Sequence, residues 1–168
     1  MRFLKSFYYA GRGIVSALGQ RNFRFHVCAA AFVIFFAAKF YSFSAERWAI
    51  LFLTCGSVMS LELINTAIEN LSDKITEENS RRIRLAKDCA AGAVLLSAVF
   101  AVGVGIALFW DTDRFRLIGI YFSETARLAA LLMAAVIAWA VIFLPETPRD
   151  PKKKRGKNHL SKGNNNYE

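Results

Sequence analysis

Three acidic side chains and one amide recur at helical spacing in an otherwise apolar part of the chain. Glu62, Asn65, Glu69 and Asp73 occupy positions i, i+3, i+7 and i+11, so on a helix they share one face. Carboxylates are costly near hydrocarbon and usually face the interior of a helix bundle. Aligned oxygen ligands of this kind suit a hard cation. The pattern therefore predicts a cation site, although Asp73 alone fits a solvated helix end equally well.

The helices that must position these side chains are indicated by four apolar blocks. The chain has 168 residues and is 55% hydrophobic, and the blocks cover residues 26–43, 48–71, 89–110 and 125–144. Each block is long enough, or nearly so, for the ~20 residues that cross a bilayer. The basic N-terminal stretch lacks the compact apolar core and cleavage site of a removable signal peptide. We therefore expect an all-α membrane protein.

The distribution of basic residues predicts the orientation of the spans. Lys and Arg are concentrated before the first block, between the second and third blocks, and after the fourth, whereas the other two connections hold few. Because cytoplasmic segments are enriched in Lys and Arg, we expect four spans in a bacterial inner (cytoplasmic) membrane with both termini in the cytoplasm. The net charge of +9 then reflects topology and contact with anionic lipid. A nucleic-acid partner would need a soluble basic domain, and the sequence shows none.

Other patterns concern the surroundings of the spans. An apolar stripe with a basic opposite face predicts a helix that lies in the membrane surface; the stripe comprises Phe3, Phe7, Ala10, Ile14 and Leu18. Small residues at four-residue spacing predict close helix–helix contacts or, alternatively, alanine-rich faces toward lipid. They are Cys89, Ala93, Ser97, Ala101 and Gly105, followed by Ala126, Ala130, Ala134 and Ala138. We interpret Cys28, Cys55 and Cys89 as packing residues.

A further carboxylate begins the third block. Lys87 and Asp88 precede its apolar residues, and we expect Asp88 to lie at the membrane level of Glu69 on the neighbouring helix. Carboxylates from two facing helices are a common way to build a cation site in a bundle.

The strings around these acids carry a family resemblance. Residues 62–73 fit the pattern E-x-x-N-[ST]-A-I-E-x-x-x-D, and residues 86–94 fit A-K-D-x-x-[AS]-[AG]-A-V. Over residues 2–110 the chain resembles the prokaryotic diacylglycerol kinase and undecaprenol kinase family. The resemblance implies a homotrimer of small membrane subunits, each with a surface helix and three spans, whose active sites lie between subunits. It also implies transfer of the γ-phosphate of MgATP to a membrane lipid alcohol.

The same resemblance implies roles for individual residues. Glu62 falls on the catalytic base and Glu69 on a Mg²⁺ ligand, and Asn65 falls on the asparagine that orders the site. The residues expected to contact the nucleotide are Arg12, Asn65, Asp73, Lys87 and Asp88. Each assignment suits its chemistry, because a carboxylate can accept the proton of an alcohol and a lysine is a point charge for phosphate.

Two departures from the family pattern stand out. Gln20 occupies the position of a second metal-binding glutamate, so we expect it to ligate Mg²⁺ through a neutral oxygen and more weakly. In addition, the chain continues beyond the family core. We expect residues 1–110 to form the kinase core, residues 111–148 an outer loop and a fourth transmembrane helix, and residues 149–168 a disordered polybasic tail. The addition is expected to support assembly and membrane placement and to take no part in the chemistry.

Three functions remain open from the sequence. The favoured one is a lipid kinase that prefers undecaprenol to diacylglycerol, because the stretch 21–26 ends in His26, as in the undecaprenol kinase branch. The alternative is a catalytically impaired family member that acts as a lipid-binding or assembly scaffold, for which Gln20 is the evidence. An ion or proton carrier fits poorly, because the acids gather at one membrane face and form no path across it.

Overall fold

The computed structural model describes residues 2–75 and 81–146, and it confirms an all-α membrane fold. The helices are α1 (Arg2–Ala17), α2 (Arg21–Phe40), α3 (Ala45–Ile75), α4 (Arg81–Phe109), α5 (Thr112–Tyr121) and α6 (Thr125–Ile142). Within the described ranges there is no strand. Four of the helices, α2, α3, α4 and α6, are long and apolar enough to cross a membrane. The expected polybasic tail lies outside the described residues.

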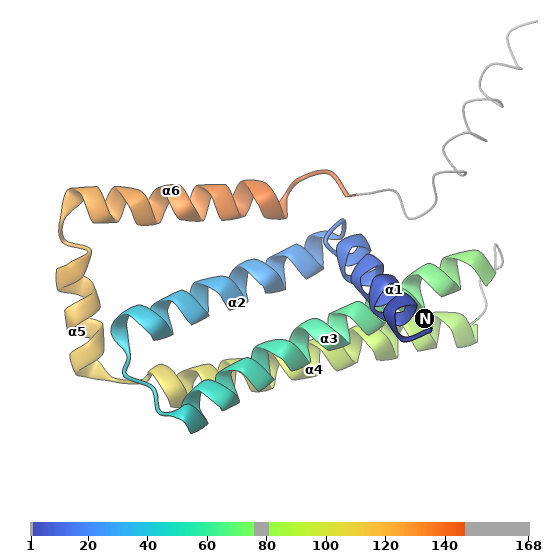
Figure 1. Cartoon of the computed structure of the whole chain (residues 1–168), viewed down its shortest axis with the longest axis horizontal. Coiled ribbons are helices and arrows are strands. Elements are labelled where there is room, and N and C mark those ends of the chain that lie inside the picture. Colours follow the sequence, from blue (N-terminus) through green and yellow to red (C-terminus); the bar gives the residue numbers. More distant parts are fainter. Residues whose placement is uncertain (1, 76–80, 147–168) are drawn as a thin grey trace, which may run out of the picture.

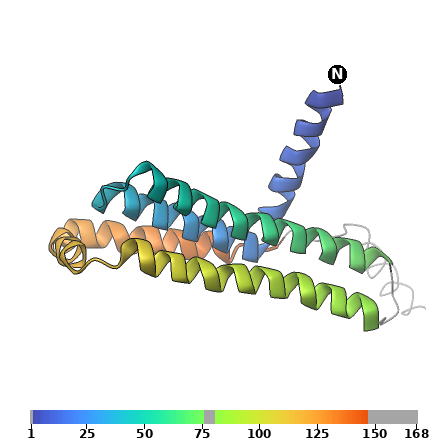
Figure 2. The ribbon, with the colours of Figure 1, turned by 90° about the horizontal axis from the view of Figure 1, so that it is seen from below.

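The bundle is built around the antiparallel pair of α3 and α4, which lie side by side along most of their length (Figures 1 and 2). Helix α2 packs against α3, and α6 packs against α2. The C-terminal end of α1 meets the bundle, and the N-terminal end of α1 projects away from the bundle (Figure 2). The predicted surface helix is therefore present, and it is joined to α2 by a short turn.

A small apolar core holds the helices together at the end where α2 stops. Ala37, Leu51 and Leu108 are buried there, one from each of α2, α3 and α4. The Tyr41 hydroxyl donates a hydrogen bond of 2.8 Å to the Phe109 carbonyl and so ties the α2–α3 connection to the end of α4. Burial and the neighbouring Asp111 carboxylate raise the pKa of Tyr41, although the Arg114 guanidinium opposes the shift. The hydroxyl therefore remains a donor at neutral pH.

Helices α2, α3 and α4 are longer than the apolar blocks that predicted them, whereas α6 ends two residues before its block does. Helix α2 begins at Arg21, and α3 and α4 extend the second and third spans into the charged segment between them. Helix α5 lies in the part of residues 111–148 that was expected from the sequence to be an outer loop before the fourth transmembrane helix. Asp111 caps this helix by accepting hydrogen bonds from the backbone N–H groups of Asp113 and Arg114, at 3.0 and 3.1 Å. Helix α5 crosses the end of the bundle and connects α4 to α6 (Figure 1).

The small residues of α4 and α6 line open space within this chain. Ala101 and Gly105 border an apolar cleft of about 360 Å³ between α2, α3 and α4. Ala130, Ala134 and Ala138 border a groove of about 720 Å³ between α2 and α6. A Cβ built on Gly105 would meet nothing within 4 Å. Within this chain these faces therefore do not bring helix backbones close together, contrary to the helix–helix contacts that the small-residue spacing predicted.

Candidate active site

Five polar side chains are buried in the part of the chain that the structure describes. They are Gln20, Arg24, Glu62, Asn65 and Thr66. The first two belong to the start of α2 and the turn before it, and the other three to the C-terminal half of α3. Because α1 also packs against α3, both groups lie at the same end of the bundle (Figure 1). Buried polar groups are expensive and need partners, so this end is the candidate active site.

The acidic face of α3 forms as the spacing predicted. Glu62 is 3% exposed and Asn65 is 5% exposed, and both lie on a single continuous helix. The Asn65 amide nitrogen, Nδ2, donates a hydrogen bond of 3.3 Å to Oε1 of Glu69 one turn further along. This contact orients the Glu69 carboxylate. The ordering role that the family resemblance implies for Asn65 stays a prediction, and this hydrogen bond is compatible with it.

The other polar atom of Asn65, the carbonyl oxygen Oδ1, is one of two buried side-chain oxygens without a hydrogen-bond partner among the described residues, the second being Oδ1 of Asn70. Leaving such an atom unpaired costs about 1–3 kcal/mol. The Asn65 oxygen lies on the same side chain that holds Glu69. Asn65 therefore presents an acceptor oxygen that a cation or a donor group of a substrate would satisfy.

These oxygens fit the Mg²⁺ that the sequence predicts. Among the described residues no group of three or more His, Cys, Asp and Glu side chains is assembled that could hold a metal by itself. Mg²⁺ rarely uses such a cage and is usually bound by one or two carboxylates together with substrate phosphates and water. Glu69 supplies the carboxylate, and Asn65 supplies a neutral oxygen beside it. The donor set suits a metal that arrives with a nucleotide.

The far end of the acidic face is joined to α4 by an ion pair. The Lys87 ammonium nitrogen, Nζ, lies 2.9 Å from Oδ1 of Asp73, and their side chains are 36% and 43% exposed. An exposed pair of this kind adds little to stability. The pair matters for position, since it places the Lys87 ammonium of α4 next to the acidic face of α3. Asp88 is exposed on α4 beside it.

Arg12 is not drawn into this group by the fold of a single chain. It is exposed on α1, and its guanidinium carbon lies 5.9 Å from the centre of the Tyr8 ring on the same helix. Gln20, in contrast, is only 8% exposed and is the N-cap residue of α2. The structure thus buries Gln20, Glu62 and Asn65, connects Asn65 to Glu69 and Asp73 to Lys87, and leaves Arg12 on the projecting helix.

Two further residues of the site were not predicted from the sequence. Thr66 is buried at 7% exposure one turn after Glu62, on the face that the acidic spacing had already defined. Arg24 is buried at 7% exposure near the start of α2. The available signal for Arg24 was an arginine two residues before the first apolar block, close enough to hydrocarbon to need hydrogen-bond acceptors.

Comparison with known proteins gives a consistent result. The family described as prokaryotic diacylglycerol kinase matches residues 8–109. The undecaprenol kinase of Bacillus subtilis (strain 168) is 45% identical over 109 residues, which are 64% of this chain and 88% of that protein. The diacylglycerol kinase of Synechocystis sp. (strain ATCC 27184 / PCC 6803 / Kazusa) is 46% identical over 104 residues, 61% of this chain and 59% of that protein. No solved structure gives a significant match. The family match ends at Phe109, so α5 and α6 lie outside it.

Proposed function

The chain belongs to the prokaryotic diacylglycerol kinase family, and from this premise we propose that it phosphorylates undecaprenol in preference to diacylglycerol. It is a lipid kinase, a phosphotransferase that acts on an alcohol, and a multi-pass membrane protein. ATP is the co-substrate that the kinase family implies. The similarity to an undecaprenol kinase over 88% of that protein's length favours the polyprenyl alcohol.

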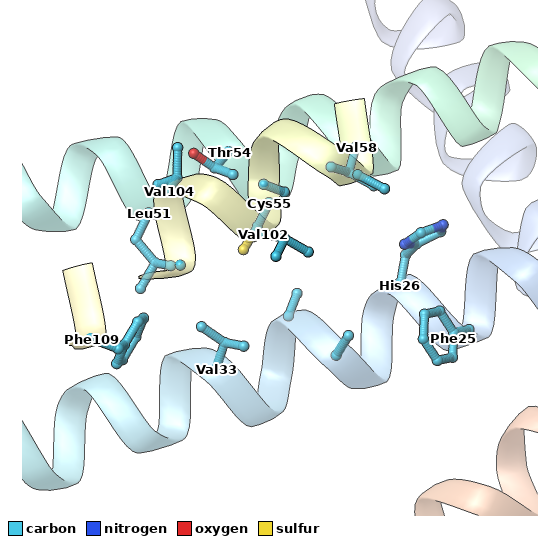
Figure 3. A pocket seen from close by; sticks show the side chains of 15 residues that line it. Phe25, His26, Val33, Leu51, Thr54, Cys55, Val58, Val102, Val104 and Phe109 are labelled. Carbon is cyan, nitrogen blue, oxygen red and sulfur yellow. The ribbon is translucent and has the colours of Figure 1, made fainter. Parts of the chain in front are cut away.

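The observation that carries the proposal is the continuity between an apolar cleft and the acidic face of α3. Leu51, Cys55 and Val58 line the cleft (Figure 3). Glu62 follows Val58 four residues later in α3, so helical geometry places it one turn further on the same side of the helix. His26 lies toward the same end of the cleft as Val58 (Figure 3). A lipid chain held in the cleft would therefore bring its hydroxyl group toward Glu62.

The residues of the site suggest how the transfer proceeds. The oxygen of the lipid hydroxyl attacks the γ-phosphorus of ATP while Glu62 accepts the hydroxyl proton, and ADP leaves. Asn65 keeps the Glu69 carboxylate aimed into the site. Lys87 can leave Asp73 for the phosphates of the nucleotide, because the pair is exposed. Mg²⁺, when bound at Glu69 and Asn65, would neutralise the charge that builds up on the phosphate oxygens.

Assembly and orientation are parts of the same proposal. The end of the bundle that holds the site also carries the basic residues of α1, of the start of α2 and of the start of α4, so we place it at the cytoplasmic surface with both termini on that side. Many large apolar side chains of α4 are exposed in the single chain, Leu95, Val99 and Phe100 among them. These faces would contact lipid or neighbouring subunits in the homotrimer that the resemblance implied.

We expect purified full-length protein to transfer labelled phosphate from ATP to undecaprenol with a higher kcat/KM than to diacylglycerol. Each lipid is offered separately in mixed micelles with saturating Mg²⁺. A preference for diacylglycerol would reverse the acceptor assignment and leave the kinase assignment intact. Transfer to neither lipid would favour the scaffold alternative, whose specific support is the neutral Gln20.

We expect Gln20→Glu to lower the Mg²⁺ concentration for half-maximal rate by about tenfold, equivalent to about 1.4 kcal/mol of metal binding. The substitution supplies a charged ligand at a position that is already buried and set by the start of α2. Gln20→Met is the control of similar size without an oxygen ligand, and it should raise the requirement. A higher requirement in Gln20→Glu would show that the site is built around the amide.

A further inference from the structure

Arg24 is the one buried cation among the described residues, and backbone carbonyl groups satisfy it completely. Its Nε and Nη2 donate to the Ile142 carbonyl at 3.3 and 3.0 Å, and Nη2 also donates to the Leu144 carbonyl. Its Nη1 donates to the carbonyls of Leu18 and Gly19, both at 3.2 Å. A guanidinium has five N–H groups, so these five hydrogen bonds use its full donor capacity.

The acceptors come from the C-terminal ends of two helices. Helix α1 ends at Ala17, directly before Leu18 and Gly19, and α6 ends at Ile142. The last carbonyls of a helix lack partners within it and carry the negative end of its dipole. A positive charge placed between two such ends is stabilised by both. Arg24 therefore cross-links the end of α6 to the turn between α1 and α2.

Neighbouring contacts support the same junction. The backbone N–H of Arg21 donates to Oε1 of Glu146 at 3.4 Å, and the Arg21 guanidinium carbon lies 6.0 Å from the centre of the Phe143 ring. Along the rest of its length, α6 borders the open groove beside α2 and has no buried residue of its own. The C-terminal end is therefore where α6 is attached most specifically.

We propose that α6 is a working part of the kinase and that Arg24 is a positioning residue, which locks the end of α6 to the α1–α2 turn and thereby places Gln20. The backbone N–H of Arg24 donates to the Gln20 carbonyl at 3.2 Å, while its side chain holds the two residues before Gln20. The inference rests on the proposed function. It changes the expectation that residues 111–168 support assembly and membrane placement and take no part in the chemistry, because the lock reaches from α6 to Gln20, the residue expected to ligate Mg²⁺.

The lock itself is tested without any activity measurement. Cys28 on α2 and Ala138 on α6 line the same groove, so a bismaleimide should cross-link Cys28 to an introduced Ala138→Cys in full-length protein that carries Cys55→Ala and Cys89→Ala. Arg24→Lys should reduce the cross-linking yield severalfold, because lysine keeps the charge but lacks the fork that reaches both helix ends. Arg47→Lys, at the other end of α3 and exposed, is the matched control. An unchanged yield in Arg24→Lys would overturn the lock.

The positioning role is tested by the metal requirement. Arg24→Lys should raise the Mg²⁺ concentration for half-maximal rate severalfold, whereas a merely structural role would lower the maximal rate and leave that concentration unchanged. Two alanines inserted after Ala134 turn the rest of α6 by about 200° and carry the Ile142 carbonyl away from Arg24. This variant should show the same rise, and combining it with Arg24→Lys should add nothing, since both break one contact.

Two alanines inserted after Ser123, before α6 begins, are the control for chain length and should leave the metal requirement unchanged. An additive effect of Arg24→Lys and the insertion after Ala134, or no shift in either, would overturn the positioning role. If the unmodified protein phosphorylates no lipid, the proposed function fails, and the cross-linking result still decides whether Arg24 locks α6 in place.

Discussion

Glu62→Gln is expected to reduce the maximal rate of lipid phosphorylation by about 10²–10⁴-fold, the range typical for loss of a general base. Glutamine preserves the size and the burial of the side chain, which is 3% exposed in the structure, but it cannot accept the proton of the alcohol. The KM for ATP should change little, because the base acts on the chemical step and not on nucleotide binding. Steady-state kinetics at saturating lipid separate the two effects.

The matched control for this substitution is Glu46→Gln on the same helix. Glu46 is exposed in the first turn of α3, far from the acidic face, so the control should retain normal kinetics. If Glu62→Gln instead keeps nearly full activity while binding ATP normally, Glu62 is not the base. A proportional loss in both variants would indicate damage to α3 as a whole.

Glu69→Ala is expected to lower activity by about 10²-fold or more at the Mg²⁺ concentration that saturates the unmodified protein. A metal ion supplies several kcal/mol of transition-state stabilisation, and each 1.36 kcal/mol corresponds to a tenfold rate. The substitution removes the carboxylate that Asn65 orients and leaves the Asn65 amide without that partner. A titration of rate against Mg²⁺ should show that higher concentrations recover only part of the loss.

Glu69→Asp tests whether the charge or its position matters more. It keeps the carboxylate but shortens its reach, so it should retain more activity than Glu69→Ala and need more Mg²⁺ than the unmodified protein. Glu124→Ala is the control, because Glu124 pairs with Arg127 on the exposed surface at the start of α6. An unchanged Mg²⁺ requirement in Glu69→Ala would move the metal site to other residues.

The sequence by itself determined the spans and the acidic face. A bilayer leaves no water for backbone groups, so each apolar block of sufficient length must be helical. Once α3 is a helix, its periodicity alone aligns Glu62, Asn65 and Glu69. The family strings around these residues predicted a lipid kinase, and the family match over residues 8–109 confirms that assignment. Helix α1 was predicted in the same local way, from its apolar stripe.

Helix ends and connections were less predictable, because they depend on single side chains. Helix α5 is capped by Asp111. It is held to the end of α2 by the Arg114 guanidinium, which donates a hydrogen bond of 3.2 Å to the Phe40 carbonyl. Its sequence contains charged residues and is too short to cross a membrane, so hydropathy did not distinguish it from a loop. Small residues at four-residue spacing likewise did not reveal whether a partner would fill the space beside them.

Only the tertiary structure decided how distant segments meet at the site. The lock between Arg24 and the Ile142 carbonyl joins residues 118 positions apart. Its acceptors are backbone carbonyls, which every residue type has, so the sequence could not single them out. The pair of Lys87 and Asp73 likewise depends on how far α3 and α4 extend past the apolar blocks. The periodicity of a pattern follows from the geometry of one helix, whereas contacts of this kind follow from the packing of several helices. The link between α6 and Gln20 could therefore be recognised only in the tertiary structure.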